Sequence, residues 1–334
     1  MDHDENLSYF LTLSKIKGIG AVKFNQILQK NNKLGISLKD FFKLNVMDLR
    51  TNYPFLQSVS GESILNHESK LFEEIKTLKM LCKLSIRVIT TLDKTYPSRL
   101  REGLGNSSPP ILYVRGNLDL LNQRQFAIVG TRNPTREAIQ ITKLASIIFS
   151  QNQFTITSGY ADGIDIIAHN TALELGGTTI FVLGSGMFHS SEKSINDNKH
   201  SNTNCLFISE FHPTFPWHKG YLMTRNRTIC ALADGVLVVE AKENGGAYYT
   251  GNYALMMNKL VYTTAFENKT NHNSGNTMLI KKGAIAIPFR DNELDEISSN
   301  FEQIAGELKS SKSLYINNKS LSQYKLFHNN EDHK

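Results

Sequence analysis

The feature that most constrains the fold is an alternation of short apolar runs with amphipathic segments between residues 126 and 263. Short runs rich in β-branched and aromatic residues are typical of strands buried on both faces of a sheet. Helical patterns of about 10–15 residues between such runs are typical of parallel strands joined by crossover helices. The alternation therefore predicts an α/β fold with a doubly wound, mostly parallel sheet. The predicted strands are Phe126–Val129, Phe154–Thr157, Thr179–Leu183, Leu206–Ile208, Val236–Glu240 and Leu260–Thr263, and the predicted helices include Ala138–Phe149, Ile164–Leu175 and Tyr249–Met257.

The N-terminal region has a different pattern. Between Leu7 and Arg87, apolar residues recur at three- and four-residue spacings, and strand-like runs are lacking. The stretch Leu13–Gly20 is similar to a helix–hairpin–helix turn, whose Gly-x-Gly loop offers backbone N–H groups to a phosphate. We therefore expect a small helical domain over residues 1–88, of the helix–hairpin–helix or SAM-like type.

The C-terminal region is polar. Beyond Arg290 the chain is rich in Asn, Ser, Lys and Glu, with one helix expected around Leu294–Leu308 and a disordered end at Asn329–Lys334. The expected organisation is a helical domain (1–88), an α/β domain (89–290) and a polar tail (291–334).

Composition constrains the cellular compartment more than it constrains the function. The sequence holds no apolar run of the roughly 18–20 residues that a membrane helix needs. The N-terminus is acidic and polar, unlike a secretory signal. The three cysteines, Cys82, Cys205 and Cys230, have no metal-like spacing and suit a reducing compartment. We expect a cytoplasmic protein without membrane contact. The net charge of +6 permits an acidic partner but does not by itself indicate one.

The first candidate ligand site follows the first predicted strand of the α/β domain. Gly130, Thr131 and Arg132 form a short turn, and Thr135 is placed to cap the next helix. Ligands of open α/β sheets bind outside the carboxyl ends of strands, where helix N-termini attract anions and an arginine can hold a phosphate. An ordinary strand–turn–helix with a surface arginine gives the same pattern. The sequence holds neither a GxGxxG fingerprint nor a P-loop.

The second candidate follows the next strand. Gly159 and Gly163 allow close backbone approach to a ligand, and the hydroxyl of Ser158 can donate to a phosphate. Asp165 and His169 lie four residues apart on one predicted helix face. They would form either a catalytic dyad or a structural hydrogen bond, and the lack of an accompanying nucleophile favours the structural role.

Two further turns complete the set. Arg225, Asn226 and Arg227 precede the apolar segment Ile229–Ala233, and we expect them at the start of a helix. Two arginines there oppose the helix dipole, so a bound anion would relieve the repulsion. Gly245 and Gly246 form a flexible, amide-rich turn after the strand that ends at Glu240.

Other chemistry is not indicated. His189, His200, His212, His218 and His272 share no metal-ligand spacing. Phe215 and Trp217 would serve either as loop packing or as a platform for base stacking, with packing favoured. A carboxylate at a strand end such as Glu240 is more often structural than catalytic. We expect no catalytic residues, no metal and no cofactor.

Taken in order, these turns resemble the DprA/Smf family. The resemblance covers roughly residues 90–290 and depends on several ordered motifs. They are Tyr96-Pro97-Ser98-Arg99-Leu100, Pro109 to Asn117, Val129-Gly130-Thr131-Arg132, Ser158 to Asp165 with His169 following, Gly184-Ser185-Gly186, Ser209-Glu210, Arg225-Asn226-Arg227, Val238-Val239-Glu240-Ala241 and Leu279 to Ala284.

The resemblance implies a Rossmann-like protein that binds single-stranded DNA, protects incoming DNA and loads the RecA recombinase during natural transformation. It also implies a homodimer and no enzymatic activity. By residue matching, the DNA or phosphate site would contain Gly130, Thr131, Arg132, Ser158, Gly159, Gly163, Arg225, Asn226, Arg227, Gly245 and Gly246.

The chain departs from the family pattern at several points. Leu222-Met223-Thr224 stands where the family has Phe-Pro, although Tyr221 would be able to substitute, and no clear winged helix follows Arg290. Two alternatives stay open. One is a nucleotide or nucleoside-phosphate hydrolase that uses Glu240 or Asp165. The other is a DNA- or nucleotide-sensing module of a defence pathway.

Overall fold

The computed structural model describes residues 3–59, 64, 67–189, 203–290 and 294–310. The predicted disordered end at Asn329–Lys334 lies outside these residues. The described residues fall into two compact units. Unit 1 draws on Met1–Arg115, Ser185–Asn196 and Ile208–Trp217, and unit 2 on Gly116–Gly184, Asp197–Phe207 and His218–Lys334. The domain boundaries expected at residues 88 and 290 stay predictions, because compactness does not show which segment folds independently.

Unit 1 begins with the predicted helices. The hairpin-like turn lies between the first two of them, with Gly18 at φ +90° and Gly20 as the N-cap of the second. Phe10 and Phe24 of these two helices pack with ring centroids 5.7 Å apart. An antiparallel pair of strands then follows, and the sequence patterns did not identify it. The elements are α1 (His3–Ser14), α2 (Ala21–Leu34), α3 (Leu38–Phe41), α4 (Val46–Asn52), α6 (Glu68–Lys83), β1 (Arg87–Thr90), α7 (Ser98–Leu104) and β2 (Ile111–Gly116), with 3-10 turns at Pro54–Leu56 and Gly105–Ser107.

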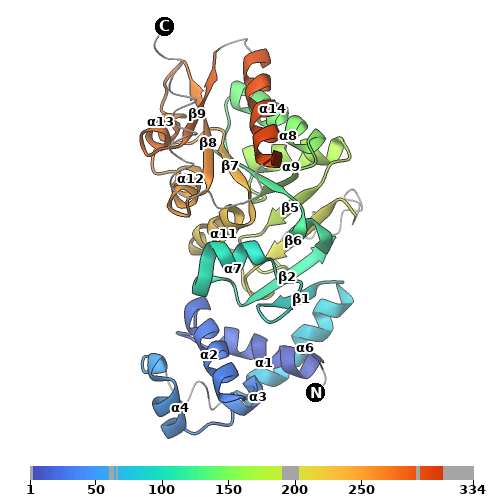
Figure 1. Cartoon of the computed structure of the whole chain (residues 1–334). Coiled ribbons are helices and arrows are strands. Elements are labelled where there is room, and N and C mark those ends of the chain that lie inside the picture. The colour runs from blue at the N-terminus through green and yellow to red at the C-terminus, as the bar shows by residue number, and fades with distance from the viewer. Residues whose placement is uncertain (1–2, 60–63, 65–66, 190–202, 291–293, 311–334) are drawn as a thin grey trace. The chain divides into compact units, whose positions relative to one another are not determined.

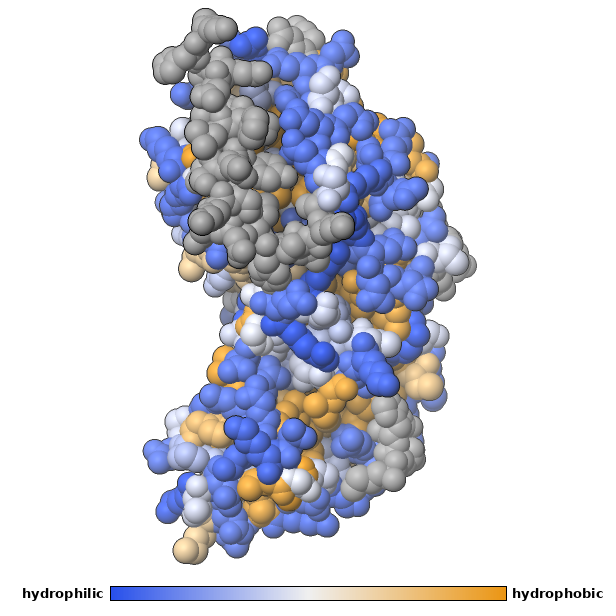
Figure 2. All heavy atoms as spheres, in the orientation of Figure 1, coloured by the Kyte–Doolittle hydropathy of each residue, from blue (hydrophilic) through white to orange (hydrophobic). Residues whose placement is uncertain are grey.

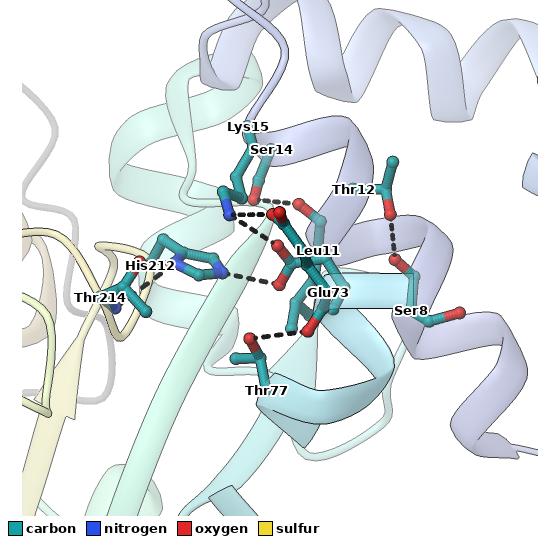
Figure 3. A network of polar contacts seen from close by, with 10 residues as sticks. Ser8, Leu11, Thr12, Ser14, Lys15, Glu73, Thr77, His212 and Thr214 are labelled. Carbon is teal, nitrogen blue, oxygen red and sulfur yellow. Dashed lines mark hydrogen bonds and ion pairs between the residues drawn. The ribbon is translucent and has the colours of Figure 1, made fainter. Parts of the chain in front are cut away.

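A buried polar network joins three segments of unit 1 (Figure 3). The carboxylate of Glu74 on α6 lies 2.9 Å from Lys15 Nζ and 2.8 Å from His212 Nε2. His212 Nδ1 in turn lies 2.8 Å from Thr214 Oγ1. Burial raises the pKa of Glu74, but hydrogen bonds and charges from His212 and Lys15 outweigh it, and the pKa falls below its ordinary value. The carboxylate is therefore held ionised between its two partners.

Unit 2 contains the parallel sheet that the sequence predicts. Its strands run in the order β5-β4-β3-β7-β8-β9, and the register of each adjacent pair is parallel. The six predicted strands are confirmed, five of them within one or two residues at each end, whereas the last continues three residues beyond the predicted Thr263. The seventh, β9, was missed because only alternate residues are buried and Pro288 interrupts it, as is usual at a sheet edge. The strands are β3 (Gln125–Val129), β4 (Thr155–Ser158), β5 (Thr179–Val182), β6 (Cys205–Ser209, next to β5), β7 (Gly235–Val238), β8 (Leu260–Phe266) and β9 (Ile285–Phe289).

Helices cover both faces of this sheet (Figure 1). One layer contains α8 (Arg136–Gln151), α9 (Ile164–Glu174) and α14 (Leu294–Ser310), and the other contains α11 (Lys219–Leu232), α12 (Gly246–Met256) and α13 (Ser274–Lys281). From β3 the chain winds through β4 to β5 on one side, whereas β7 pairs with the opposite edge of β3. The winding direction therefore reverses between β3 and β7, and this switch point is where doubly wound sheets bind ligands.

The helix expected around Leu294–Leu308 is present as α14 and packs into the core of unit 2. Its apolar residues Ile297, Phe301, Ile304, Ala305 and Leu308 lie on one face and join Phe126 and Phe149 in a single cluster. Arg124 donates hydrogen bonds to the carbonyls of Leu308 and Lys309 at the end of the helix. The polar composition of this region led us to expect a tail and concealed that this helix joins the core, because its buried residues are separated by exposed polar ones.

The surface adds two observations. Hydrophilic residues cover most of the face shown in Figure 2. Among the helices of the described residues, none has the length and apolar character needed to cross a membrane.

Candidate functional site

The turn after β3 is held in place by Glu240. Thr131 N donates to the backbone oxygen of Glu240 over 2.8 Å. The carboxylate of Glu240 accepts from the backbone N–H and the hydroxyl of Thr135, each over 3.0 Å. The Thr135 hydroxyl oxygen also accepts from Ala138 N, so it caps α8 as predicted. Glu240 is 1% exposed. Its carboxylate thus orders the turn that carries Arg132.

Two glycines lock this turn against the start of α9. A Cβ on Gly130 would lie 2.5 Å from Ile164 Cγ1. A Cβ on Gly163 would lie 2.4 Å from the carbonyl oxygen of Thr131, and Gly163 has φ +83°. Ile164 N donates to that same oxygen over 3.2 Å. The tip of the turn remains accessible, because Arg132 is exposed and Thr131 is half-buried.

The turn after β4 is ordered from beneath. The Ser158 hydroxyl donates to Ile128 O over 2.6 Å, and the residue is fully buried. The Asp165 carboxylate accepts from the backbone N–H groups of Gly159 (3.2 Å) and Ala161 (3.4 Å). Tyr160 between them has φ +58°, a strained value for an aromatic residue. We expected the hydroxyl of Ser158 to donate to a phosphate, but it already donates to a carbonyl oxygen in the interior of unit 2.

Asp165 and His169 have different partners. His169 is fully buried, and its Nδ1 lies 2.6 Å from Thr179 Oγ1. The hydroxyl of Thr179 donates onward to Ile156 O. Asp165 is 6% exposed, and burial raises its pKa above the ordinary value, while the charge of Arg225 and hydrogen bonds from the turn lower it by less. These contacts agree with a structural role for both residues.

Arg225, Asn226 and Arg227 lie in the middle of α11, and the expected helix start was wrong. The helix begins at Lys219, with His218 Nδ1 accepting from Gly220 N as the N-cap. The apolar pattern from Ile229 onward misled the prediction, because the first six residues of α11 are exposed or half-buried and their pattern is mixed. The argument from the helix dipole therefore does not apply to these arginines. Arg225 and Asn226 are buried, and Arg227 is half-buried.

The Gly245–Gly246 turn lies at the carboxyl end of β7. Gly245 N donates to Lys242 O over 3.0 Å, and α12 begins at Gly246, which is exposed. A residue that the sequence analysis missed fixes this loop. Asn276 accepts from Ala241 N over 2.8 Å and donates to the carbonyls of Val239 and Thr264. No sequence signal marks Asn276, because its partners come from two other strand ends.

The structure thus brings the turns after β4, β3 and β7 to neighbouring strand ends, around the switch point. Arg132, Thr131 and Gly246 are accessible there, whereas Ser158 and Arg225 face inward. The N-terminus of α12 and the exposed Arg132 at this edge suit an anionic ligand. Within the described part of the chain, no three His, Cys, Asp or Glu side chains group as a metal site requires.

Comparisons with known proteins point to one family. Residues 87–301 match the model of the family described as DNA recombination-mediator protein A. The chain is 30% identical over 287 residues to Protein Smf of Synechocystis, covering 84% of this chain and 70% of that protein. It is 29% identical over 252 residues to DNA processing protein DprA of Bacillus subtilis, covering 73% of this chain and 84% of the relative.

Two solved structures have a similar fold. The crystal structure of DprA from Streptococcus pneumoniae aligns with a TM-score of 0.64 and 25% identity, covering 84% of this chain and 94% of that one. DprA from Helicobacter pylori, whose structure describes a single-stranded DNA binding mode, aligns with a TM-score of 0.54 and 26% identity, covering 66% and 96%.

Proposed function

Because the chain belongs to the DNA recombination-mediator protein A family, the DprA/Smf family, we propose that it is a DNA-processing protein that binds single-stranded DNA. The Helicobacter pylori relative is described as a single-stranded DNA binder, and it shares the fold with this chain. The proposed mode of binding is contact with successive phosphates, because the accessible groups of the site are one arginine and the N-terminus of α12 rather than a set of base-reading side chains.

The observation that carries this proposal is the position of Arg132. It is exposed at the tip of a turn that Glu240, Gly130 and Gly163 hold rigidly beside the switch point. A guanidinium carried by such a fixed backbone can bind a phosphate with two hydrogen bonds. The neighbouring first turn of α12, which begins at the exposed Gly246, offers backbone N–H groups for the next phosphate along the strand.

We further propose that the protein is not an enzyme. The two carboxylates that a hydrolase would use are already engaged, Glu240 with Thr135 and Asp165 with Gly159 and Ala161. We expect no turnover when the purified protein is incubated with nucleoside mono- and triphosphates. Hydrolysis that disappears in Glu240→Gln would favour the nucleotide hydrolase instead.

The proposed biological role is the protection of incoming DNA and the loading of RecA during natural transformation, by a homodimer in the cytoplasm. Membership of the family supports this role. Its test is RecA ATPase activity on single-stranded DNA coated with a competing binding protein. We expect the chain to shorten the lag before RecA activity. An unchanged lag, with DNA binding intact, would restrict the role to binding.

The central test is a fluorescence anisotropy titration with single-stranded, duplex and mononucleotide ligands. We expect a preference for single strands and an affinity that falls with salt as counterions are released. Arg132→Ala should weaken binding roughly ten- to hundredfold, because a charge-assisted contact contributes about 1.5–3 kcal/mol. Arg50→Ala, which removes another exposed arginine, one that lies in unit 1, is the control and should change affinity little.

Two results would contradict the proposal. Equal affinity for duplex and single strands would remove the preference for single-stranded DNA. If folded Arg132→Ala binds within about twofold of the parent protein, the DNA site lies elsewhere.

A further inference from the structure

Arg225 is turned into the body of unit 2. It lies midway along α11, and its side chain is only 5% exposed. A Cβ on Gly159 would lie 1.1 Å from Arg225 Nη1 and 2.2 Å from Cζ. The guanidinium therefore rests directly on the backbone of the turn after β4, in space that exists only because residue 159 is glycine.

Asp165 lies on the other side of this contact. Its carboxylate is 8% exposed and lies 3.8 Å from Arg225 Nη1. The same oxygen, Oδ2, accepts from Gly159 N and Ala161 N. The turn is thus fixed from two directions, by a carboxylate that binds its amides and by a guanidinium that packs on Gly159. Neither charged group faces the surface.

The contacts continue from this turn to Arg132. Gly163 ends the turn. A Cβ at this position would lie 2.4 Å from the carbonyl oxygen of Thr131 and 2.6 Å from that of Arg132, so only glycine fits here. Ile164 N donates to the Thr131 carbonyl oxygen. A shift of the Gly159–Gly163 segment would therefore displace the backbone that carries Arg132.

We propose that Arg225 and Asp165 are positioning residues of the DNA site, a buried ion pair that fixes the Gly159–Gly163 turn and through it Arg132, without touching DNA. The inference rests on the proposed binding of single-stranded DNA. It assigns the matched arginine of the Arg-Asn-Arg motif to the support of the site instead of to its contact surface.

The two roles predict opposite signs for one substitution. If Arg225 bound a phosphate, Asp165 would compete with the DNA for it, and Asp165→Asn would leave affinity unchanged or strengthen it. If the pair positions the turn, Asp165→Asn weakens affinity, because an amide side chain replaces the carboxylate that accepts from two backbone N–H groups. We expect about a tenfold loss.

Asp162→Asn is the matched control, because Asp162 belongs to the same turn but is exposed. It removes the same charge without removing a buried contact. We expect affinity within about twofold of the parent or slightly tighter, because a negative charge near the DNA is lost. An equal loss in Asp162→Asn and Asp165→Asn would overturn the proposal.

A double-mutant cycle tests the pair itself. Arg225→Gln should weaken binding about as much as Asp165→Asn. The affinity of the double variant should lie within about twofold of the affinity of the single variant that binds less tightly, because a buried pair acts as one unit. If the two single losses of affinity multiply in the double variant, the residues do not act as a pair.

Salt dependence provides a second readout. Removing a phosphate contact lowers the slope of log K against log salt by about 0.7 for single strands, so Arg132→Ala should lower it and Arg225→Gln should not.

Hydrogen exchange separates this proposal from the proposed function. Without DNA, the amides of Gly159 and Ala161 should exchange faster in Asp165→Asn than in the parent, while the strand amides of β3 stay protected. If the parent fails to bind single-stranded DNA, the proposed function is wrong, yet this exchange result still tests the positioning role. Unchanged exchange at both amides would overturn the positioning role whatever the DNA affinity.

Gly159→Ala gives an independent check through sterics. An added methyl group must displace the guanidinium of Arg225, so we expect a loss of affinity comparable to Arg225→Gln. Gly306→Ala is the control, because nothing lies within 4 Å of a Cβ at that exposed position of α14. If folded Gly159→Ala binds with parental affinity, the guanidinium is not needed where the structure places it.

Discussion

Glu74 in unit 1 and Asp165 in unit 2 are both buried carboxylates, but their charged partners lie at different distances. Glu74 lies 2.9 Å from Lys15 Nζ and 2.8 Å from His212 Nε2. Asp165 lies 3.8 Å from Arg225 and receives its shorter contacts from neutral backbone amides. Accordingly, partners lower the pKa of Glu74 despite its burial, whereas burial raises the pKa of Asp165 despite Arg225.

The difference shows what each carboxylate does for its unit. Close partners compensate the desolvation of Glu74 and tie α6 to Lys15, just after α1, and to the segment around His212. Asp165 is incompletely compensated and instead determines the shape of one turn through its amides. We infer that the first carboxylate mainly stabilises the fold and that the second mainly shapes the site.

The largest expected effect is on the stability of unit 1. Glu74→Gln leaves two partners without their charged acceptor, and breaking a buried pair in this way costs about 3–5 kcal/mol. Urea unfolding followed by far-UV circular dichroism measures this loss. Glu73→Gln is the control, because Glu73 is 65% exposed and lies 3.6 Å from Lys15, so we expect a change below about 0.5 kcal/mol. Similar losses in both variants would remove the special role of Glu74.

A smaller effect is expected in unit 2. Asp165→Asn should cost roughly 1–2 kcal/mol, because it mainly weakens hydrogen bonds to neutral amides. Unfolding followed by far-UV circular dichroism measures it, alongside the DNA affinity. If Asp165→Asn destabilises the protein as strongly as Glu74→Gln does, the two carboxylates do not differ in their contribution to the stability of the fold.

The smallest effect is on the pH dependence of stability, where the two residues should act in opposite directions. The folded pKa of Glu74 is lowered, so its contribution is present above about pH 4.5 and is lost as pH falls through the folded pKa. The folded pKa of Asp165 is raised, so stability is highest below about pH 3.8 and declines as pH rises through the folded pKa. Each slope is at most about 1.4 kcal/mol per pH unit for one proton.

The measurement is urea unfolding between pH 3 and pH 8 for the parent and both variants. The stability lost in Glu74→Gln should grow as pH rises above the acid range, and the stability lost in Asp165→Asn should shrink. If the stability losses of the two variants change in the same direction with pH, the distance to the charged partner does not determine how each carboxylate contributes to stability.

Much of the fold follows from the sequence. Six of the strands of unit 2 and the capping of α8 by Thr135 were predicted, because buried strands and helix caps leave local patterns. The strand β9 was missed, since alternate burial and Pro288 weaken its pattern. The start of α11 was also missed, because an N-cap histidine and a first turn of mixed, largely exposed residues carry no strong local signal.

The candidate site was predicted less completely. The turns at Gly130, Gly159 and Gly245 were identified and do lie at neighbouring strand ends, as parallel connectivity requires. The direction in which their side chains point was not predictable. Ser158 donates to Ile128, and Arg225 packs on Gly159, contacts that join residues 30 and 66 positions apart.

The sequence by itself determined six strands of unit 2 and the helices between them, the positions of the turns and the membership of a family, because each of these is encoded over short stretches of chain. Only the tertiary structure decided which polar residues face the ligand and which support it. Arginine and aspartate have the same local pattern in either role. The role depends on burial and on partners that folding brings close, and the residues adjacent to Arg225 or Asp165 in the sequence determine neither.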